Sequence, residues 1–502
     1  MGVMRFLVHP AEALEDWDEA HRAYISGLDA RVFPTRIEID GSLMSCRRKA
    51  SGSGKLHVAW PVPGFGRPLL STTSLSERDE PYVLAVELAR GKIAKVRDQY
   101  SAWEIAGMQT PEEFRQPHRE AYRLFSRAAL IQSEQPEEAS RLAIEALTHA
   151  CEAANILTQT YTRQRLFVRR RRAPRLPASL GCNLGPVVPE EAAADQFCQA
   201  FNAACVPVDW RSVEPAEGVY NWDTFDAQVE WCDQHKLLMR GGPLLDFSPG
   251  GLPDWLEQWE HDLFNLESFV SDFVETAISR YVGRIRLWEV SSRVNTGGAL
   301  ALTEENRLTL VAKTLETARQ IDDDIQLFIR VDQPWGDYQA RGQHRLSPLQ
   351  FVDALVRSGV GLSGVDLELA VGYRPQNSAS RDLLDLSQLL DHWSVLGIPL
   401  HVTLAFPSSG AVDPLATSDL EVNRPQWKAD WSDAAQAQWI EMFLPLLMAK
   451  QSVVGIFWAH FSDAAAHQYP HAGLLDAAGR PKPALDQITT YRRTYWKADD
   501  DS

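Results

Sequence analysis

Four acidic residues and one histidine occur in or just after strand-like runs, where a protein commonly places side chains that do chemistry: Asp246, Glu289, Asp332, Glu368 and His460. A carboxyl group can act as a general acid, a general base or a nucleophile. Glu368 is one candidate, because strand alternation turns its side chain toward the interior of the predicted sheet. Glu289 is a second, which we expect about 13 Å deeper along its strand than position 293, among buried polar residues.

Three histidines and an aspartate lie close together after the last strand-like run: His460, Asp463, His467 and His471. Imidazole and carboxylate groups can together hold a divalent ion. Their spacing matches no known metal motif, and histidines in loops are usually solvated. We therefore predict neither a metal nor a cofactor.

Strand-like runs alternate with helical stretches between residues 178 and 496. The predicted strands lie around residues 180–184, 205–208, 237–241, 285–290, 326–331, 364–371, 399–404 and 454–460. Such alternation predicts a parallel sheet that closes into a (β/α)8 TIM barrel. Apart from Glu289, the candidate residues would then meet at one mouth of the barrel.

The region before the barrel divides into two parts. Residues 1–80 are β-rich with frequent turn signals, which predicts a small β-sandwich-like domain, the kind that in other proteins binds carbohydrate. Its aromatic residues Trp60, Phe65 and Tyr82 would either stack on sugar rings or fill the core. Residues 81–172 follow a helical period and predict a helical segment.

The composition of the chain indicates which partners and which cellular compartment to expect. A net charge of −17 argues against nucleic acid, whose phosphates would be repelled. The six cysteines lack C-x-x-C spacing, so neither a zinc site nor a redox pair is indicated. No apolar run is long enough for a secretory signal or a membrane span. We expect a cytoplasmic protein with reduced thiols and no membrane partner.

Residues 273–293 read FVETAISRYVGRIRLWEVSSR. This stretch resembles the fourth helix-to-strand unit of the family-10 glycoside hydrolases, the xylanases, whose pattern is R-Y-x-G-x-(V/I)-x-x-W-D-V-V-N-E. Residues 210–226 (WRSVEPAEGVYNWDTFD), 397–403 (GIPLHVT) and 455–458 (GIFW) are similar to further motifs of that family. The resemblance implies a TIM barrel of carbohydrate metabolism with a glycan-binding cleft.

The resemblance also implies where the reaction would occur. A retaining glycosidase needs two carboxyl groups about 5 Å apart, one as acid and one as nucleophile. The family's acid/base position is Arg293 here, and the nucleophile position is Leu404. Arginine cannot usefully donate a proton at neutral pH. Trp458 and Trp210 keep the family's residue types, and with Asp246, Asp332 and His460 they are the predicted substrate-binding residues.

Glu368 stands where the family has a glutamine, and two interpretations of it remain open. A salt bridge between Glu368 and Arg293 would replace the catalytic pair and fill its space. Alternatively, Glu368 would serve as a repurposed acid or nucleophile.

Three functions therefore remain. The first is a xylanase-like pseudoenzyme that binds a glycan or glycoside; it predicts an open groove faced by Trp458 and Trp335. The second is an active O-glycosyl hydrolase with a rebuilt site; it predicts a second carboxylate about 5–10 Å from Glu368. The third is a non-enzymatic scaffold or interaction protein, which predicts a groove filled by side chains.

Overall fold

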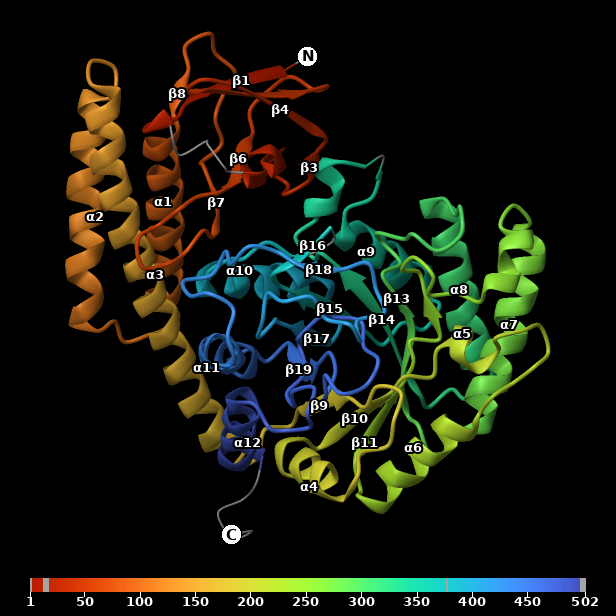
Figure 1. Ribbon diagram of the computed structural model, residues 1–502. Coiled ribbons are helices and arrows are strands. Elements are labelled where there is room, and N and C mark those ends of the chain that lie inside the picture. The colour runs from red at the N-terminus through yellow and green to blue at the C-terminus, as the bar shows by residue number, and fades with distance from the viewer. Residues whose placement is uncertain (1, 12–17, 343, 376–377, 497–502) are drawn as a thin grey trace.

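The computed structural model describes residues 2–11, 18–342, 344–375 and 378–496. A strand-rich region and three long helices lie to one side of a closed barrel (Figure 1). The barrel carries the candidate residues, and the N-terminal region packs against it.

The strand-rich region contains two antiparallel-rich sheets, ordered β4-β5-β1-β8 and β3-β2-β6-β7. Their strands are β1 (Gly2–Leu7), β2 (Tyr24–Ser26), β3 (Val32–Phe33), β4 (Thr35–Asp40), β5 (Leu43–Arg48), β6 (Lys55–Ala59), β7 (Leu69–Ser71) and β8 (Tyr82–Val83), with a 3-10 turn, η2 (Asp18–Arg22). Phe6 of one sheet and Leu56 of the other share one apolar core. Trp60 and Tyr82 are buried in that core, so they present no surface on which a sugar could stack.

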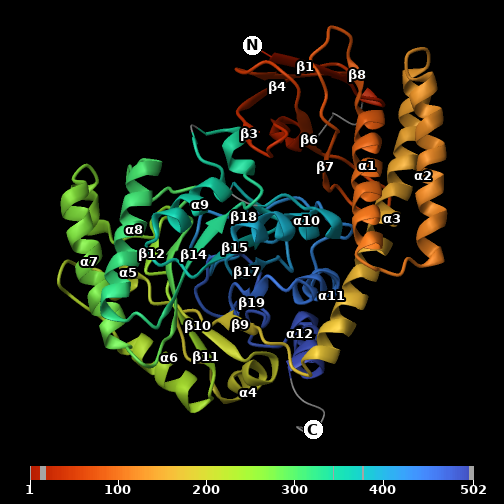
Figure 2. The same cartoon turned by 180° about the vertical axis from the view of Figure 1, so that it is seen from behind.

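The helical segment consists of α1 (Leu84–Ile105), α2 (Glu112–Ile131) and α3 (Pro136–Arg172). Helix α3 runs from the strand-rich region down the side of the barrel (Figure 2). At its C-terminal end the Arg169 guanidinium donates to the carbonyl oxygens of Met448 and Lys450, at 2.6 and 2.9 Å. Through Arg169, the arginine-rich C-terminal end of α3 is thus bound to the barrel.

The barrel is closed by eight parallel strands in the order β11-β10-β9-β19-β17-β15-β14-β13, with β13 pairing back onto β11. These strands are β9 (Ser179–Asn183), β10 (Ala203–Val206), β11 (Leu238–Gly241), β13 (Leu287–Ser292), β14 (Gln326–Asp332), β15 (Gly364–Ala370), β17 (Leu400–Ala405) and β19 (Val453–Trp458). Each predicted strand is present within a few residues, and the predicted TIM barrel is confirmed.

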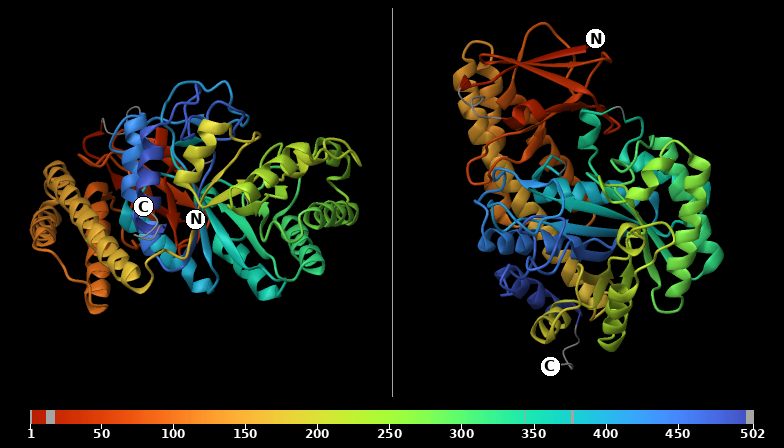
Figure 3. Two further views of the ribbon diagram at one scale, coloured as in Figure 1. Left: turned by 90° about the horizontal axis from the view of Figure 1, so that it is seen from below. Right: turned by 45° about the vertical axis from the view of Figure 1, so that its right-hand side comes forward.

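Helices surround the sheet on the outside, as the view from below and the view turned by 45° show (Figure 3). They are α4 (Glu191–Ala200), α5 (Trp210–Val213), α6 (Asp223–Gln234), α7 (Leu263–Arg280), α8 (Glu304–Ile321), α9 (Pro348–Ser358), α10 (Leu383–Trp393), α11 (Asp433–Ala449) and α12 (Pro483–Trp496). Short elements between them are β12 (Leu245–Asp246), β16 (Tyr373–Arg374), β18 (Glu421–Val422), η3 (Asp254–Trp259), η4 (Asp337–Ala340) and η5 (Ser394–Leu396).

Ion pairs and backbone hydrogen bonds join the N-terminal region to the barrel. Lys92 pairs with Asp382, and Lys95 Nζ lies 2.6 Å from Asp385 Oδ1. The amide of Leu69 donates to the carbonyl of Ser380 at 2.8 Å. The two parts therefore share a bonded interface rather than a loose linker.

All six cysteines are free thiols, and five of them are buried. No helix in the described ranges has the length and apolarity that crossing a bilayer requires.

Candidate functional site

A polar cleft opens at the mouth formed by the C-terminal ends of the barrel strands. Its volume is about 680 Å³, and its wall includes Asn183, Asp209, Asp246, Glu368 and His460. Functional sites of TIM barrels lie at this end, because the loops that follow the strands meet there. The cleft is therefore the candidate site for binding or catalysis, and side chains do not fill it.

Arg293 and Glu368 form the ion pair that the sequence suggested. Arg293 Nη2 donates to Glu368 Oε1 at 2.8 Å and to the Tyr469 hydroxyl at 3.0 Å. Burial alone would raise the pKa of Glu368, but the charges of Arg293 and Arg330 outweigh it and hold that pKa below its usual value. Arg293 adopts φ of 51°, a left-handed conformation that costs a non-glycine residue about 1–2 kcal/mol. The ion pair helps to hold this strained residue in the cleft wall.

Below this pair lies a buried charge network, which we call the barrel floor: Arg240, Glu289, Arg330 and Asp366. Arg240 bonds both Glu289 and Asp366, and Arg330 Nη2 donates to Glu289 Oε2 at 2.6 Å. Asp366 also accepts from the Thr403 hydroxyl at 2.6 Å. Glu289 is 1% exposed and does not line the cleft. Its contacts are those of the buried polar residue that we expected.

Two further carboxyl groups, Asp209 and Asp246, line the cleft without a cationic partner among the described residues. Asp209 caps α5 by accepting from the Ser212 amide at 2.8 Å. Asp246 accepts from the Ser292 hydroxyl at 2.8 Å and the Ser248 amide at 2.9 Å. Burial raises the pKa of Asp209 to about 6, and the nearby charge of Asp246 adds to this. A carboxyl group that keeps its proton near pH 6 can serve as a general acid.

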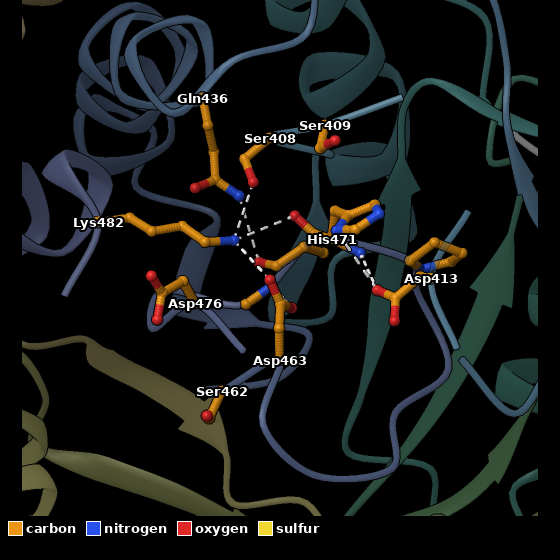
Figure 4. A network of polar contacts seen from close by, with 12 residues as sticks. Ser408, Ser409, Asp413, Gln436, Ser462, Asp463, His471, Asp476 and Lys482 are labelled. Carbon is orange, nitrogen blue, oxygen red and sulfur yellow. Dashed lines mark hydrogen bonds and ion pairs between the residues drawn. The ribbon is translucent and has the colours of Figure 1, made fainter. Parts of the chain in front are cut away.

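His460 and His467 also line the cleft, on the loop that follows β19. His460 Nε2 lies 2.9 Å from Asp463 Oδ1, and Lys482 Nζ lies 2.6 Å from the other oxygen of Asp463. The close-up shows Lys482 reaching Asp463 and Ser408 (Figure 4). Burial lowers the pKa of His460, although Asp463 works against this shift.

Ligand atoms of His460, Asp463 and His467 lie within 4.8 Å of one another, which is close enough to consider a metal ion. The two imidazole rings, however, are stacked, with centroids 4.4 Å apart and planes 10° apart. A coordinated ion lies in the plane of each imidazole, so parallel stacked rings cannot both direct a lone pair at one ion. His471 does not join the cluster, since its Nε2 bonds the Ala411 carbonyl at 3.0 Å.

The sequence of this barrel matches the model of a known protein family. The model of glycosyl hydrolase family 10 matches residues 201–491. The chain belongs to glycosyl hydrolase family 10.

Relatives in this family are distant. Endo-1,4-beta-xylanase B of Thermotoga neapolitana is 24% identical over 43% of this chain and 61% of its own length. Endo-1,4-beta-xylanase 3 of Hypocrea jecorina is 28% identical over 30% of this chain and 40% of its own length. Both matches span less than two thirds of the relative.

Solved structures of the family are similar as well. Native xylanase 10B from Thermotoga maritima has a TM-score of 0.49 at 18% identity and covers 65% of this chain and 98% of its own. Xylanase 10B from Thermotoga petrophila, solved with xylobiose, has a TM-score of 0.48 at 18% identity, with 65% and 97% covered.

The two positions that the resemblance matches to the family's catalytic carboxylates lie in different surroundings. Arg293 is in the cleft wall, as described above. Leu404 is 3% exposed and packs with Ile440, Leu444 and Trp458 between the sheet and the helices. Its neighbour Thr403 bonds Asp366 inside the barrel, so alternation turns Leu404 outward.

The structure corrects the expected placement of the tryptophans. Trp210 is 1% exposed, stacks on Phe273 at 4.9 Å and donates to Glu214 Oε2 at 2.7 Å. Trp458 is 3% exposed and donates to the Ala472 carbonyl at 2.7 Å. Trp335 lies under Arg381, in a separate pocket between the barrel and the N-terminal region. Among the described residues that line the cleft there is no tryptophan, and the expected aromatic platforms are missing.

Of the other expected binding residues, the cleft contains Asp246 and His460 but not Asp332. Asp332 is 1% exposed, and burial raises its pKa to about 6. Sequence reasoning missed Asp209 and Tyr469. The signal for Asp209 was its position directly before a short helix, where an aspartate commonly acts as an N-cap; no sequence signal pointed to Tyr469.

Proposed function

We propose that this family-10 barrel has lost the retaining mechanism and binds a short glycan or glycoside in its cleft. The observation that carries the proposal is the ion pair between Arg293 and Glu368. It occupies the acid/base position with a permanent cation and fastens the nearest carboxylate to that cation. Loss of either catalytic carboxyl group removes most of the chemical step.

The character of the cleft supports a ligand that is bound through hydrogen bonds. Carboxylates, amides and hydroxyls dominate its wall, whereas tryptophan platforms, on which a long polymer would stack, are missing from its described residues. Sugar hydroxyls suit such a wall, because each can donate to a carboxylate and accept from an amide. The open volume of about 680 Å³ also disfavours a scaffold whose groove is filled.

The test is a prolonged incubation of concentrated protein with xylohexaose, analysed for shorter products, beside a thermal melt with the same sugar. We expect no cleavage and a rise in melting temperature, since a ligand that binds only the folded state stabilises it by about 2.7 kcal/mol at one hundred times its Kd. Cleavage by the wild type that disappears in Glu368→Gln would overturn the proposal.

Asp209 favours a second candidate, an active O-glycosyl hydrolase with a rebuilt site. Its raised pKa of about 6 suits a general acid, and Glu368, held ionised, would be the second carboxyl group. In that case both Asp209→Asn and Glu368→Gln would abolish cleavage, whereas Asp254→Asn, at an exposed acid bonded to Arg211, would leave it unchanged.

A further inference from the structure

His460 has one ring nitrogen in use and one without a partner. Asp463 is a carboxylate, so the hydrogen bond at 2.9 Å requires His460 Nε2 to carry the proton. The other nitrogen, Nδ1, is buried and has no hydrogen-bond partner among the described residues. The side chain as a whole is only 5% exposed and forms part of the cleft wall.

Three donors fix the carboxylate that orients this ring. Asp463 Oδ1 accepts from His460 Nε2 and from the Gly473 amide at 2.7 Å, and Oδ2 accepts from Lys482 Nζ at 2.6 Å. A side chain at position 473 would collide with Asp463, so glycine is needed for this approach. Lys482 is held in turn by the Ser408 hydroxyl at 2.9 Å (Figure 4).

These contacts define what His460 can recognise. With the proton on Nε2, the free nitrogen Nδ1 is an acceptor only. A buried acceptor without a partner is costly, and an incoming donor recovers that cost. Glu368 Oε2 is a second acceptor of the same wall without a hydrogen-bond partner among the described residues, and Arg330 Nη1 lies 3.7 Å from it. A ligand that satisfies these two atoms must bring hydrogen-bond donors, as the hydroxyls of a neutral sugar do.

We propose that His460 Nδ1 accepts a hydrogen bond from a ligand hydroxyl in the cleft, and that Asp463 and Lys482 are positioning residues that fix this tautomer. This inference rests on the proposed function and names one group through which the neutral sugar is recognised.

The chain offers a matched pair of substitutions. In His460→Gln the amide lies where Nε2 stood, so the bond to Asp463 is kept and the acceptor at Nδ1 is lost. In His460→Asn the amide lies where Nδ1 stood, so the acceptor is kept and the bond to Asp463 is lost. We expect His460→Gln to bind xylotriose about five- to tenfold more weakly than the wild type, as measured by calorimetry, because one hydrogen bond to the ligand is lost. The affinity of His460→Asn should stay closer to that of the wild type.

A nitrogen-15 NMR spectrum of protein labelled at histidine reports directly which ring nitrogen of His460 carries the proton. The signals of His460 are identified as those that disappear in His460→Gln. We expect a protonated Nε2 and an unprotonated Nδ1 in the free protein, and a shift of the Nδ1 signal when xylotriose is added. A protonated Nδ1, or an Nδ1 signal unmoved by saturating xylotriose, overturns the inference and leaves the proposed function intact. If neither xylotriose nor xylohexaose binds, the proposed function fails and the inference fails with it.

Discussion

The barrel floor and the cleft contain the same kinds of side chain in opposite situations. At the floor, Arg240 and Arg330 neutralise Glu289 and Asp366, and all four groups are buried or nearly so. In the cleft, Asp209 and Asp246 are only partly buried and have no cationic partner among the described residues. Carboxylates that are paired and buried hold the barrel together, whereas unpaired carboxylates with a free oxygen are available to a ligand.

Glu368 and Arg293 lie between these two levels. They line the cleft, yet they are paired as the floor residues are, and Arg330 approaches both Asp366 and Glu368. The floor thus extends upward to position 293, which the sequence resemblance matches to the family's acid/base carboxylate. This continuity supports the proposal that the pair is structural rather than catalytic.

Arg240→Met should give the largest effect. It leaves Glu289 and Asp366 buried with fewer positive neighbours, and removal of one partner from a buried ion pair costs about 3–5 kcal/mol. The urea midpoint of unfolding should fall accordingly. Arg284→Met is the control, because Arg284 pairs with Asp233 on the surface, where such a pair contributes about 0–1 kcal/mol. Equal losses in the two variants would contradict the distinction between floor and surface.

Lys482→Met tests a smaller network beside the cleft. Asp463 keeps its bonds from His460 and Gly473, so we expect a loss of about 1.5–3 kcal/mol, the contribution of one hydrogen bond to a charged group. Burial alone would raise the pKa of Asp463, but the hydrogen bond from His460 and the charge of Lys482 lower it.

The sign of its pH dependence follows from that depressed pKa. The stabilisation by ionised Asp463 is present above the unfolded value of about 3.9 and is lost as the pH falls toward the folded value. The difference between wild type and Lys482→Met in urea midpoint should therefore shrink below about pH 4. Lys428→Met, at an exposed lysine, should change the midpoint little at either pH; a Lys482→Met effect that persists unchanged in acid would contradict the role of the ion pair.

The fold could be predicted because apolar residues follow the strand and helix periods along the whole barrel sequence, and because a buried parallel strand tolerates few residues that are not apolar. The strands that contain Glu368 and Glu289 were found in this way, and alternation correctly turned Glu368 inward. The ion pair with Arg293 was one of two interpretations that this placement left open, and the structure contains it.

The cleft was harder to predict, because a residue type does not fix the direction of a side chain. Trp458 and Trp210 match family motifs, but an indole that finds a carbonyl or carboxylate partner can be buried as well as exposed. Leu404 occupies the matched nucleophile position, yet Thr403 beside it points inward and leaves Leu404 facing the helices. The sequence signal for Asp209 indicated a helix cap, and its position in the cleft near Asp246, which is distant in sequence, came only from the fold.

Asp209→Asn should give the smallest effect and tests the cleft side of the comparison. The folded pKa of Asp209, about 6, lies above the unfolded value of about 3.9, so its protonated form contributes stability below pH 4 that is lost as the pH rises through 6. Asparagine stays neutral and still caps α5, so the variant should melt higher than the wild type at pH 8 and at the same temperature at pH 4. We expect a gain below about 1 kcal/mol, because water screens a group that is partly exposed. Asp262→Asn is the control for a cap outside the cleft, since Asp262 caps α7 through Asn265 and is exposed. It should not raise the melting temperature at pH 8 as Asp209→Asn does, because a carboxylate at an exposed helix N-terminus is favourable. A stabilisation of Asp209→Asn that did not depend on pH would mean that the carboxyl group is not strained by its place in the cleft, and Asp209 would then lose its claim to act as an acid.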